Sequence, residues 1–176
     1  QWSFPIFVSP HAPNPLSASS TVFHRSTNEG QSWEAIRPYL TRADPSKLVS
    51  SGGPITQDNT SVEYYCTIFA LAESKLEKGV LWAGTDDGLV QVSRDAGRSW
   101  QKVTPPALPE WATVNSIDPG THAPGTAYVA AHRYRLDDFR PYAYVTHDYG
   151  RSWRSTAGDL PADGGFVRVV REDPVR

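Results

Sequence analysis

The sequence predicts an all-β fold, a partial β-propeller of about three four-stranded blades. Short β-branched and aromatic runs, bounded by glycine, proline, aspartate and asparagine, follow one another along most of the chain. An eight-residue phrase with the pattern Ser-x-Asp-x-Gly-x-x-Trp, or a close variant, occurs three times, at residues 26–33, 93–100 and 146–153. We call these three segments the hairpin repeats. A phrase that recurs within one chain indicates repeated architecture rather than a single active site.

The second hairpin repeat, SRDAGRSW, lies in the clearest unit, residues 62–104. Four strands are expected there, at 64–71, 80–84, 89–93 and 100–103. The stretch Thr85-Asp86-Asp87-Gly88 is typical of a tight turn between the second and third strands. The hairpin repeat then joins the third strand to the fourth, so the unit is predicted to be one antiparallel blade.

The remaining units follow the same order less completely. Residues 112–156 form a second full blade, with strands expected at 112–117, 126–131, 142–146 and 153–155 and an insertion at 133–141. Residues 1–40 are predicted to be an incomplete blade, with strands only at 5–8, 21–26 and 33–36. Residues 166–172 are predicted to be the inner strand of a following blade.

The spacing of the repeats supports blades with loop insertions. Trp33 and Trp100 are 67 residues apart, and Trp100 and Trp153 are 53 apart, whereas a four-stranded blade needs about 40–50 residues. Three blades cannot close a ring, because propellers have at least four. The single domain 1–176 is therefore expected to be part of a larger propeller. Alternatively, two copies close head to tail into six blades, with 166–172 of one copy as the inner strand of the other's first blade.

The hairpin repeats resemble the Asp-box, or BNR repeat. The chain as a whole is similar to bacterial sortilin-like (Vps10-like) proteins that carry the label of BNR-repeat glycosyl hydrolases. The resemblance implies that the repeats lie at the periphery, away from any catalytic surface. The structural residues it assigns are Asn28, Gly30, Trp33, Asp95, Gly97, Trp100, Asp148, Gly150 and Trp153.

Physical chemistry gives these residues the same roles. The carboxylate accepts backbone N–H groups of its own turn, glycine supplies a positive φ, and tryptophan packs between neighbouring sheets. Thr146 keeps the hydroxyl of the first position, and Asn28 keeps an acceptor at the third while losing the charge.

Candidate catalytic residues come from the loops between second and third strands. Glycoside hydrolysis uses two carboxylates, about 5 Å apart for retention or about 6.5–9.5 Å apart for inversion. Asp86 or Asp87, with Asp137 or Asp138 of the next blade, would supply such a pair. The alternative is that Asp86-Asp87-Gly88 is an ordinary turn and that Asp137 and Asp138 are ion-paired with nearby arginines.

Candidate ligand-binding residues lie on loops near the expected channel, where propellers bind ligands. They are His132, Arg133, Tyr134, Tyr64 and Arg168, with Glu63, Tyr65 and Arg171 close to them in sequence. Two classes of function stay open. One is a carbohydrate-active glycoside hydrolase or its non-catalytic relative, with a glycan ligand, as the resemblance implies. The other is a sortilin-like propeller that binds protein or peptide.

Composition excludes other classes. The net charge is −2, unlike the basic surface of a nucleic-acid-binding protein, and no apolar run is long enough to span a membrane. The five histidines show no metal-ligand spacing, and no cofactor motif is present, so we expect neither metal nor cofactor. The chain has no methionine and no signal-peptide pattern. We therefore expect a processed chain or a fragment, located outside the cell or in the periplasm.

Overall fold

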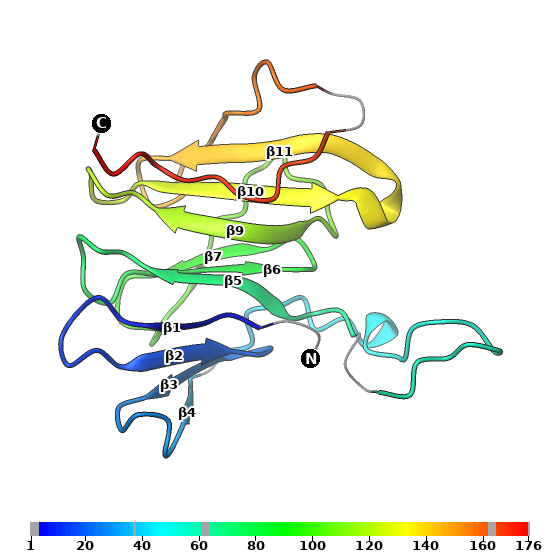
Figure 1. Cartoon of the computed structure of the whole chain (residues 1–176), viewed down its shortest axis with the longest axis horizontal. Coiled ribbons are helices and arrows are strands. Elements are labelled where there is room, and N and C mark those ends of the chain that lie inside the picture. The colour runs from blue at the N-terminus through cyan, green and yellow to red at the C-terminus, as the bar shows by residue number, and fades with distance from the viewer. Residues whose placement is uncertain (1–3, 37, 61–63, 162–164, 176) are drawn as a thin grey trace.

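Three antiparallel sheets of four strands make up the protein (Figure 1). The computed structural model describes residues 4–36, 38–60, 64–161 and 165–175. Within these ranges there are twelve strands and no α-helix, which confirms the predicted all-β class. No helix among the described residues is long and apolar enough to cross a membrane.

The first sheet has the order β1-β2-β3-β4, and its strands are β1 (Ile6–Val8), β2 (Leu16–Ser19), β3 (Phe23–Ser26) and β4 (Glu34–Ile36). The prediction that residues 1–40 form an incomplete blade is therefore wrong. The missing strand is β2, whose Leu-Ser-Ala-Ser sequence has no β-branched or aromatic residue. It forms a strand because β1 and β3 pair with it on both sides. Since β1 already lies at the inner edge, the first blade needs no inner strand from another copy.

The second and third sheets have the same strand order as the first. The second contains β5 (Ile68–Glu73), β6 (Leu81–Thr85), β7 (Val90–Ser93) and β8 (Gln101–Lys102). The third contains β9 (Thr113–Pro119), β10 (Ala127–Arg133), β11 (Asp138–Thr146) and β12 (Arg154–Ser155). Two short 3₁₀ helices, η1 (Pro45–Lys47) and η2 (Tyr134–Leu136), lie in loops. Strand β11 begins earlier than predicted because it pairs with β10 as far as Arg133 and Asp138.

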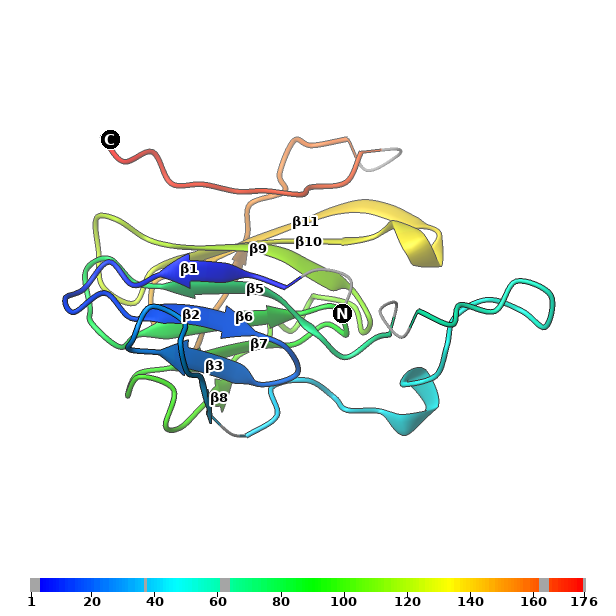
Figure 2. The ribbon, with the colours of Figure 1, turned by 60° about the horizontal axis from the view of Figure 1, so that its bottom comes forward.

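The three sheets lie side by side as successive blades (Figures 1 and 2). Phe23, Leu40, Ile68, Leu71 and Leu81 belong to the apolar cluster that joins the first blade to the second. A larger cluster joins the second blade to the third and includes Trp82, Val90, Val114 and Val129. The blades approach closely at Gly84, where an added Cβ would lie 2.3 Å from Val114 Cγ1.

Each hairpin repeat is closed by one set of hydrogen bonds. In the second repeat the Ser93 hydroxyl donates to Asp95 (2.9 Å) and accepts from Gly97 N (2.8 Å), while Asp95 accepts from Ser99 N (2.8 Å). Ala96 and Gly97 both have positive φ, 60° and 90°. The first repeat makes the same bonds through Ser26, Asn28, Gly30 and Ser32, and the third through Thr146, Asp148, Gly150 and Ser152.

The repeat tryptophans differ in what they contact. Trp100 packs edge-on against Phe23 of the first blade, with ring centroids 6.3 Å apart. Trp153 packs in the same way against Trp82 of the second blade, also at 6.3 Å. Trp33 has no earlier blade beside it among the described residues and is 41% exposed. The second and third repeats therefore bind their blades to the blade before them.

The C-terminal segment, residues 165–175, runs along the third blade (Figure 2). It contacts β9 through Asn115 Nδ2, which donates to Arg168 O (3.0 Å), and through Arg171 Nη1, which donates to Ser116 Oγ (2.9 Å). The predicted strand at 166–172 is not formed, since the described residues of this segment make no strand ladder. An inner strand pairs with the second strand of its own blade, and the described part of the chain offers the segment no such neighbour.

Candidate functional site

The two ends of the blades carry different kinds of loop. The loops between second and third strands, and those leading from one blade to the next, lie at the end marked by η1 and η2 (Figure 1). We call this the loop end. The hairpin repeats lie at the opposite end. The candidate catalytic and ligand-binding residues from the sequence fall at the loop end, with two exceptions. Glu63 lies outside the described residues, and Arg171 lies farther along β9, against Ser116 and Asp118.

Asp86 is buried within the turn after β6. Its carboxylate accepts hydrogen bonds from Thr67 N (2.8 Å) and Thr67 Oγ1 (2.9 Å). Burial raises the pKa of Asp86 to about 6, against the lowering effect of the Thr67 bonds. The carboxyl group therefore titrates about one unit below pH 7, and both of its oxygens accept hydrogen bonds from Thr67, the residue before β5.

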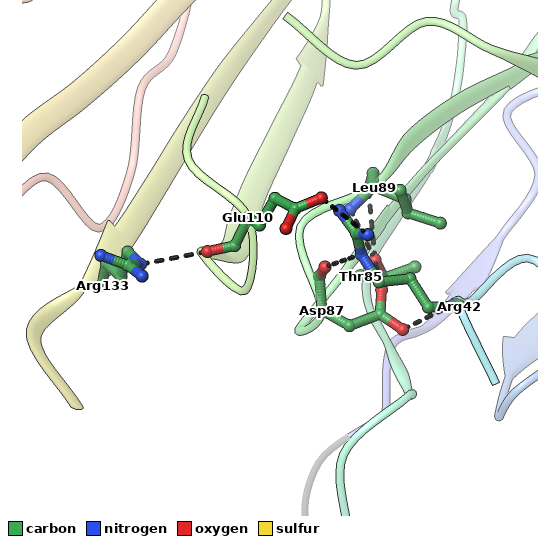
Figure 3. Close-up of polar contacts among 6 residues, drawn as sticks. All are labelled: Arg42, Thr85, Asp87, Leu89, Glu110 and Arg133. Carbon is green, nitrogen blue, oxygen red and sulfur yellow. Dashed lines mark hydrogen bonds and ion pairs between the residues drawn. The ribbon is translucent and has the colours of Figure 1, made fainter. Parts of the chain in front are cut away.

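Asp87 is fully buried and belongs to a network that crosses three blades (Figure 3). It accepts from Thr85 Oγ1 and from Arg42 N (2.7 Å). Arg42 Nε donates to the Asp87 carbonyl (2.8 Å), and Arg42 Nη1 pairs with Glu110 (3.1 Å). Arg133 Nε then donates to the Glu110 carbonyl (3.0 Å). This network holds the loops of the three blades at a fixed spacing.

Asp137 and Asp138 lie at the end of η2 and differ in environment. Asp137 is exposed, with a left-handed backbone (φ 60°) that ends the 3₁₀ helix. Asp138 accepts bonds from Arg140 (2.8 Å) and Tyr142 (2.6 Å), and Arg133 Nη1 lies 3.6 Å away. These donors, Arg140 foremost, hold the pKa of Asp138 well below its usual range. Asp138 is therefore a fixed carboxylate in an ion-paired loop.

An aromatic pair lies next to the Asp87 network. Tyr65 and Trp111 meet edge to face, with centroids 5.8 Å apart. Arg42 and Lys47 place their cationic groups 5.4 Å and 5.7 Å from the Trp111 ring centroid. Trp111 has a positive φ of 62°, a conformation that costs a bulky residue about 1–3 kcal/mol and clusters at functional sites. We call Tyr65, Trp111, Arg42 and Lys47 the aromatic platform.

A second aromatic group joins the third blade to the C-terminal segment. Tyr134 and Phe166 stack at 4.8 Å, and His132 contacts both rings at 4.7 Å and 5.7 Å. The Arg168 guanidinium lies 5.2 Å from the Phe166 centroid. Burial, with a smaller effect of Arg135 and Arg168, lowers the pKa of His132 to about 4, so this imidazole is neutral at pH 7. The group therefore fastens the segment to the blade.

Tyr64 and Cys66 flank the platform residue Tyr65. The Tyr64 hydroxyl lies 3.2 Å from Ser50 Oγ in the long loop before β5. Cys66 is buried, and burial raises the pKa of its thiol to about 11. A thiol with a raised pKa carries little thiolate at pH 7 and is unreactive.

Of the predicted ligand-binding residues, the structure brings His132, Tyr134 and Arg168 together and adds Phe166 to them. Arg133 instead contacts Glu110 and Asp138, and Tyr64 lies apart beside Ser50. Four residues that the sequence did not single out are Arg42, Lys47, Glu110 and Trp111. The signal that could have found them is position. They lie on the loops that lead into the second and third blades, and such loops approach the channel in propellers.

Three of the four candidate carboxylates make hydrogen bonds within the protein. Asp86, Asp87 and Asp138 are each occupied by hydrogen bonds within the protein. Among the described residues, no group of three or more His, Cys, Asp or Glu side chains could hold a metal ion. The platform instead offers aromatic rings and cations at the surface.

No family model and no curated protein sequence matches this chain. Solved structures do match it. An ancestral GH74 enzyme aligns with a TM-score of 0.59 at 18% identity, over 86% of this chain and 17% of its own. The GH74 xyloglucanase from Xanthomonas campestris aligns with a TM-score of 0.53 at 16% identity, over 86% of this chain and 20% of its own. The chain thus spans a fifth or less of the length of these enzymes.

The fold and these likenesses define the class of protein. The described residues are three successive blades of a partial β-propeller, the fold found in the GH74 enzymes.

Proposed function

We propose that this chain is a glycan-binding segment of a β-propeller related to BNR-repeat glycosyl hydrolases, with its three hairpin repeats as Asp-boxes. The aromatic platform at the loop end carries the proposal. Tyr65 and Trp111 come from the loops that enter the second and third blades. In a propeller these loops lie beside the channel where ligands bind.

The chemistry of the platform fits a sugar. A pyranose ring has an apolar face of C–H groups that packs on an aromatic ring, while its hydroxyl groups need polar neighbours. Trp111 and Tyr65 are only partly buried, so part of each side chain is accessible to a ligand. Arg42 and Lys47, whose cationic groups lie over the Trp111 ring, supply donors for sugar oxygens.

Binding is proposed in preference to hydrolysis by the named carboxylates. A glycosidase needs one carboxyl group as acid and a second as base or nucleophile, both reaching the sugar. Asp87 is fully buried, and Asp138 is neutralised by Arg140 and Arg133. Pairs drawn from Asp86, Asp87, Asp137 and Asp138 remain a prediction from sequence. No contact among the described residues favours the sortilin-like alternative.

The proposal includes a larger ring and a location outside the cytoplasm. The chain spans a fifth or less of its structural neighbours, and three blades leave both ends of the row open. More blades, from the rest of a longer protein or from another copy, would complete the channel. An extracellular or periplasmic location agrees with a polymeric glycan ligand.

Calorimetric titration with a xyloglucan oligosaccharide tests the proposal, since a matching structure is a xyloglucanase. Trp111→Ala should weaken binding at least about ten-fold, as expected for loss of an aromatic anchor. Trp33→Ala is the matched control, because Trp33 is an exposed tryptophan at the opposite end. Equal affinity of the parent and Trp111→Ala, or no binding of any β-glucan oligosaccharide, would contradict the proposal.

A further inference from the structure

We propose that the open side of the first blade is an interface for a second copy of this chain, docking on that copy's third blade. The surface consists of Phe4, Ile6, Val8 and Trp33, which are 54%, 57%, 60% and 41% exposed. Ser19, Ser20 and His24 line a hollow beside Trp33. We call this the first-blade face. Exposed apolar side chains grouped in this way mark an interaction site.

The same side of the other two blades is covered within the chain. Phe23 of the first blade covers Gly97, where an added Cβ would lie 3.0 Å from its ring. Val103 of the second blade covers Gly150, where an added Cβ would lie 2.6 Å away. At Gly30 the nearest atoms belong to Leu16 and Trp33 of its own blade, at 3.7 Å and 3.8 Å. The second and third blades are thus each covered on this side by the blade before them. Among the described residues, no blade covers the first-blade face.

The third blade offers the groups that the second blade uses in this interface. Trp153 Nε1 donates to the carbonyl of Val103 (2.6 Å), the residue directly after β8, whose own N–H donates to Val90 O (2.8 Å). Thr156 directly follows β12, and its N–H donates to Ala143 O (2.8 Å) in the same way. Trp100 does not make this bond, since its Nε1 donates to Gly97 O of its own repeat (3.0 Å). If Trp33 follows Trp153, its Nε1 would donate to the Thr156 carbonyl of the other copy.

Two polar side chains would face each other at the same contact. Where the second hairpin repeat meets the third, Arg94 lies 4.0 Å from the Tyr149 ring centroid. Arg94 is the second residue of its repeat, and Tyr149 is the fourth residue of the next. If the third repeat of one copy meets the first repeat of the other in the same way, the corresponding residues are His147 and Glu29. Both side chains are exposed. Two such contacts close a ring of six blades with two-fold symmetry.

The C-terminal segment occupies part of the docking position. His122 Nε2 donates to Asp173 O (2.7 Å), as His11 Nε2 donates to Ser74 O (2.8 Å) where the first blade meets the second. Residues 165–175 therefore lie against β9 where β1 of a second copy would lie. Glu172 holds them, with Thr121 N, Thr121 Oγ1 (2.8 Å) and Tyr128 OH (3.0 Å) as donors. Docking requires this segment to leave, so it competes with the second copy.

Sedimentation velocity over a range of concentrations tests the proposal on the full chain. Glu172→Ala removes the Thr121 and Tyr128 contacts and should lower the dimer dissociation constant at least ten-fold relative to the parent. Adding Trp33→Ala to Glu172→Ala should restore the monomer, whereas adding Trp111→Ala, at the other end, should leave the dimer intact. A Glu172→Ala chain that stays monomeric with a native near-ultraviolet circular dichroism spectrum, or a dimer indifferent to Trp33→Ala, would overturn the proposal.

Disulfide trapping gives a second readout that does not depend on Glu172. Glu29→Cys and His147→Cys are exposed substitutions, and the native Cys66 is buried. When the two variants are mixed under mild oxidation, the cross-linked heterodimer should form faster than either homodimer. Faster formation of the Glu29→Cys homodimer would instead show that two first-blade faces meet each other, and would overturn the proposed contact.

Discussion

At the scale of the residue, the third position of each hairpin repeat works as a turn acceptor. Asp95 and Asp148 have pKa values lowered to about 2, mainly because the hydroxyls and N–H groups of Ser99 and Ser152 donate to them. Asn28 holds the same place without a charge, and it accepts from Ser32 N (2.9 Å). The turn therefore needs an oxygen acceptor at this position more than it needs a carboxylate.

Substitution of Asp148 tests this conclusion. Asp148→Asn should lower the melting temperature only slightly at pH 7, because the amide oxygen still accepts from Ser152 N and the amide N–H₂ can donate to Ser152 Oγ, as Asn28 does to Ser32 Oγ. Asp148→Ala should lower it more, since Gly150 and Ser152 lose an ordered turn. Thermal unfolding by circular dichroism gives the order. A lower melting temperature for the asparagine variant than for the alanine variant would contradict the account of the turn.

Asp86 predicts a pH dependence of stability. Its pKa is about 6 in the folded chain, above the ordinary value of 3.8, so the folded chain binds more protons between these values than the unfolded chain does. The free energy of unfolding should therefore fall by about 2–3 kcal/mol from this group as the pH rises from about 4 to about 6. Above about pH 7, where the group is deprotonated in both states, its contribution should be constant.

The variant Asp86→Asn isolates this effect. Its amide can still accept from Thr67 N and can donate to Thr67 Oγ1. The difference in free energy of unfolding between variant and parent, from urea titrations at pH 4 to 7, should grow in favour of the variant up to about pH 6. The difference is the quantity to compare, because His132, with its lowered pKa, acts in the opposite direction over this range. A difference independent of pH would show that Asp86 titrates normally.

At the scale of the element, the repeats connect neighbouring blades. The glycine of a repeat is constrained both by its own backbone and by the blade before it. Gly30 and Gly150 share a positive φ, 86° and 81°, but only Gly150 faces another blade at close range. Substitution at Gly30 therefore measures the free energy lost to strain in the turn. Substitution at Gly150 measures that loss together with the loss from packing between blades.

Alanine substitutions at these two glycines should therefore differ. Gly30→Ala should cost about 1–2 kcal/mol, the strain of a left-handed conformation. Gly150→Ala should cost that amount and about 1–3 kcal/mol more, because the new methyl overlaps Val103. Urea unfolding monitored by tryptophan fluorescence measures both. Equal losses would show that the second and third blades yield freely at this contact.

The sequence predicts the elements better than it predicts the site. Repeats with Asp, Gly and Trp at fixed positions placed the third and fourth strands, because hairpin chemistry is local. Strand β2 could not be found in this way, since Leu-Ser-Ala-Ser carries little intrinsic strand preference and becomes a strand only between two others. Trp111 and Arg42 are 69 positions apart in the chain and meet only once the blades have packed.

At the scale of the whole molecule, the hairpin end and the loop end of the blades have separate roles. The hairpin end repeats one structure three times. The loop end has a different loop in each blade, held together by the network of Arg42, Asp87, Glu110 and Arg133 (Figure 3). Constant hairpins at one end and variable polar loops at the other are typical of a scaffold with its binding loops.

Ligand binding at the loop end is tested most directly by two-dimensional amide NMR of the isotope-labelled chain during titration with a xyloglucan oligosaccharide. The amide signals that move should belong to residues 42–47, 64–67, 86–89 and 109–112 around the aromatic platform. The signals of the hairpin repeats, 26–33, 93–100 and 146–153, should stay in place. Shifts confined to the hairpin repeats, or no shifts at saturating oligosaccharide, would contradict the assignment of glycan binding to the loop end.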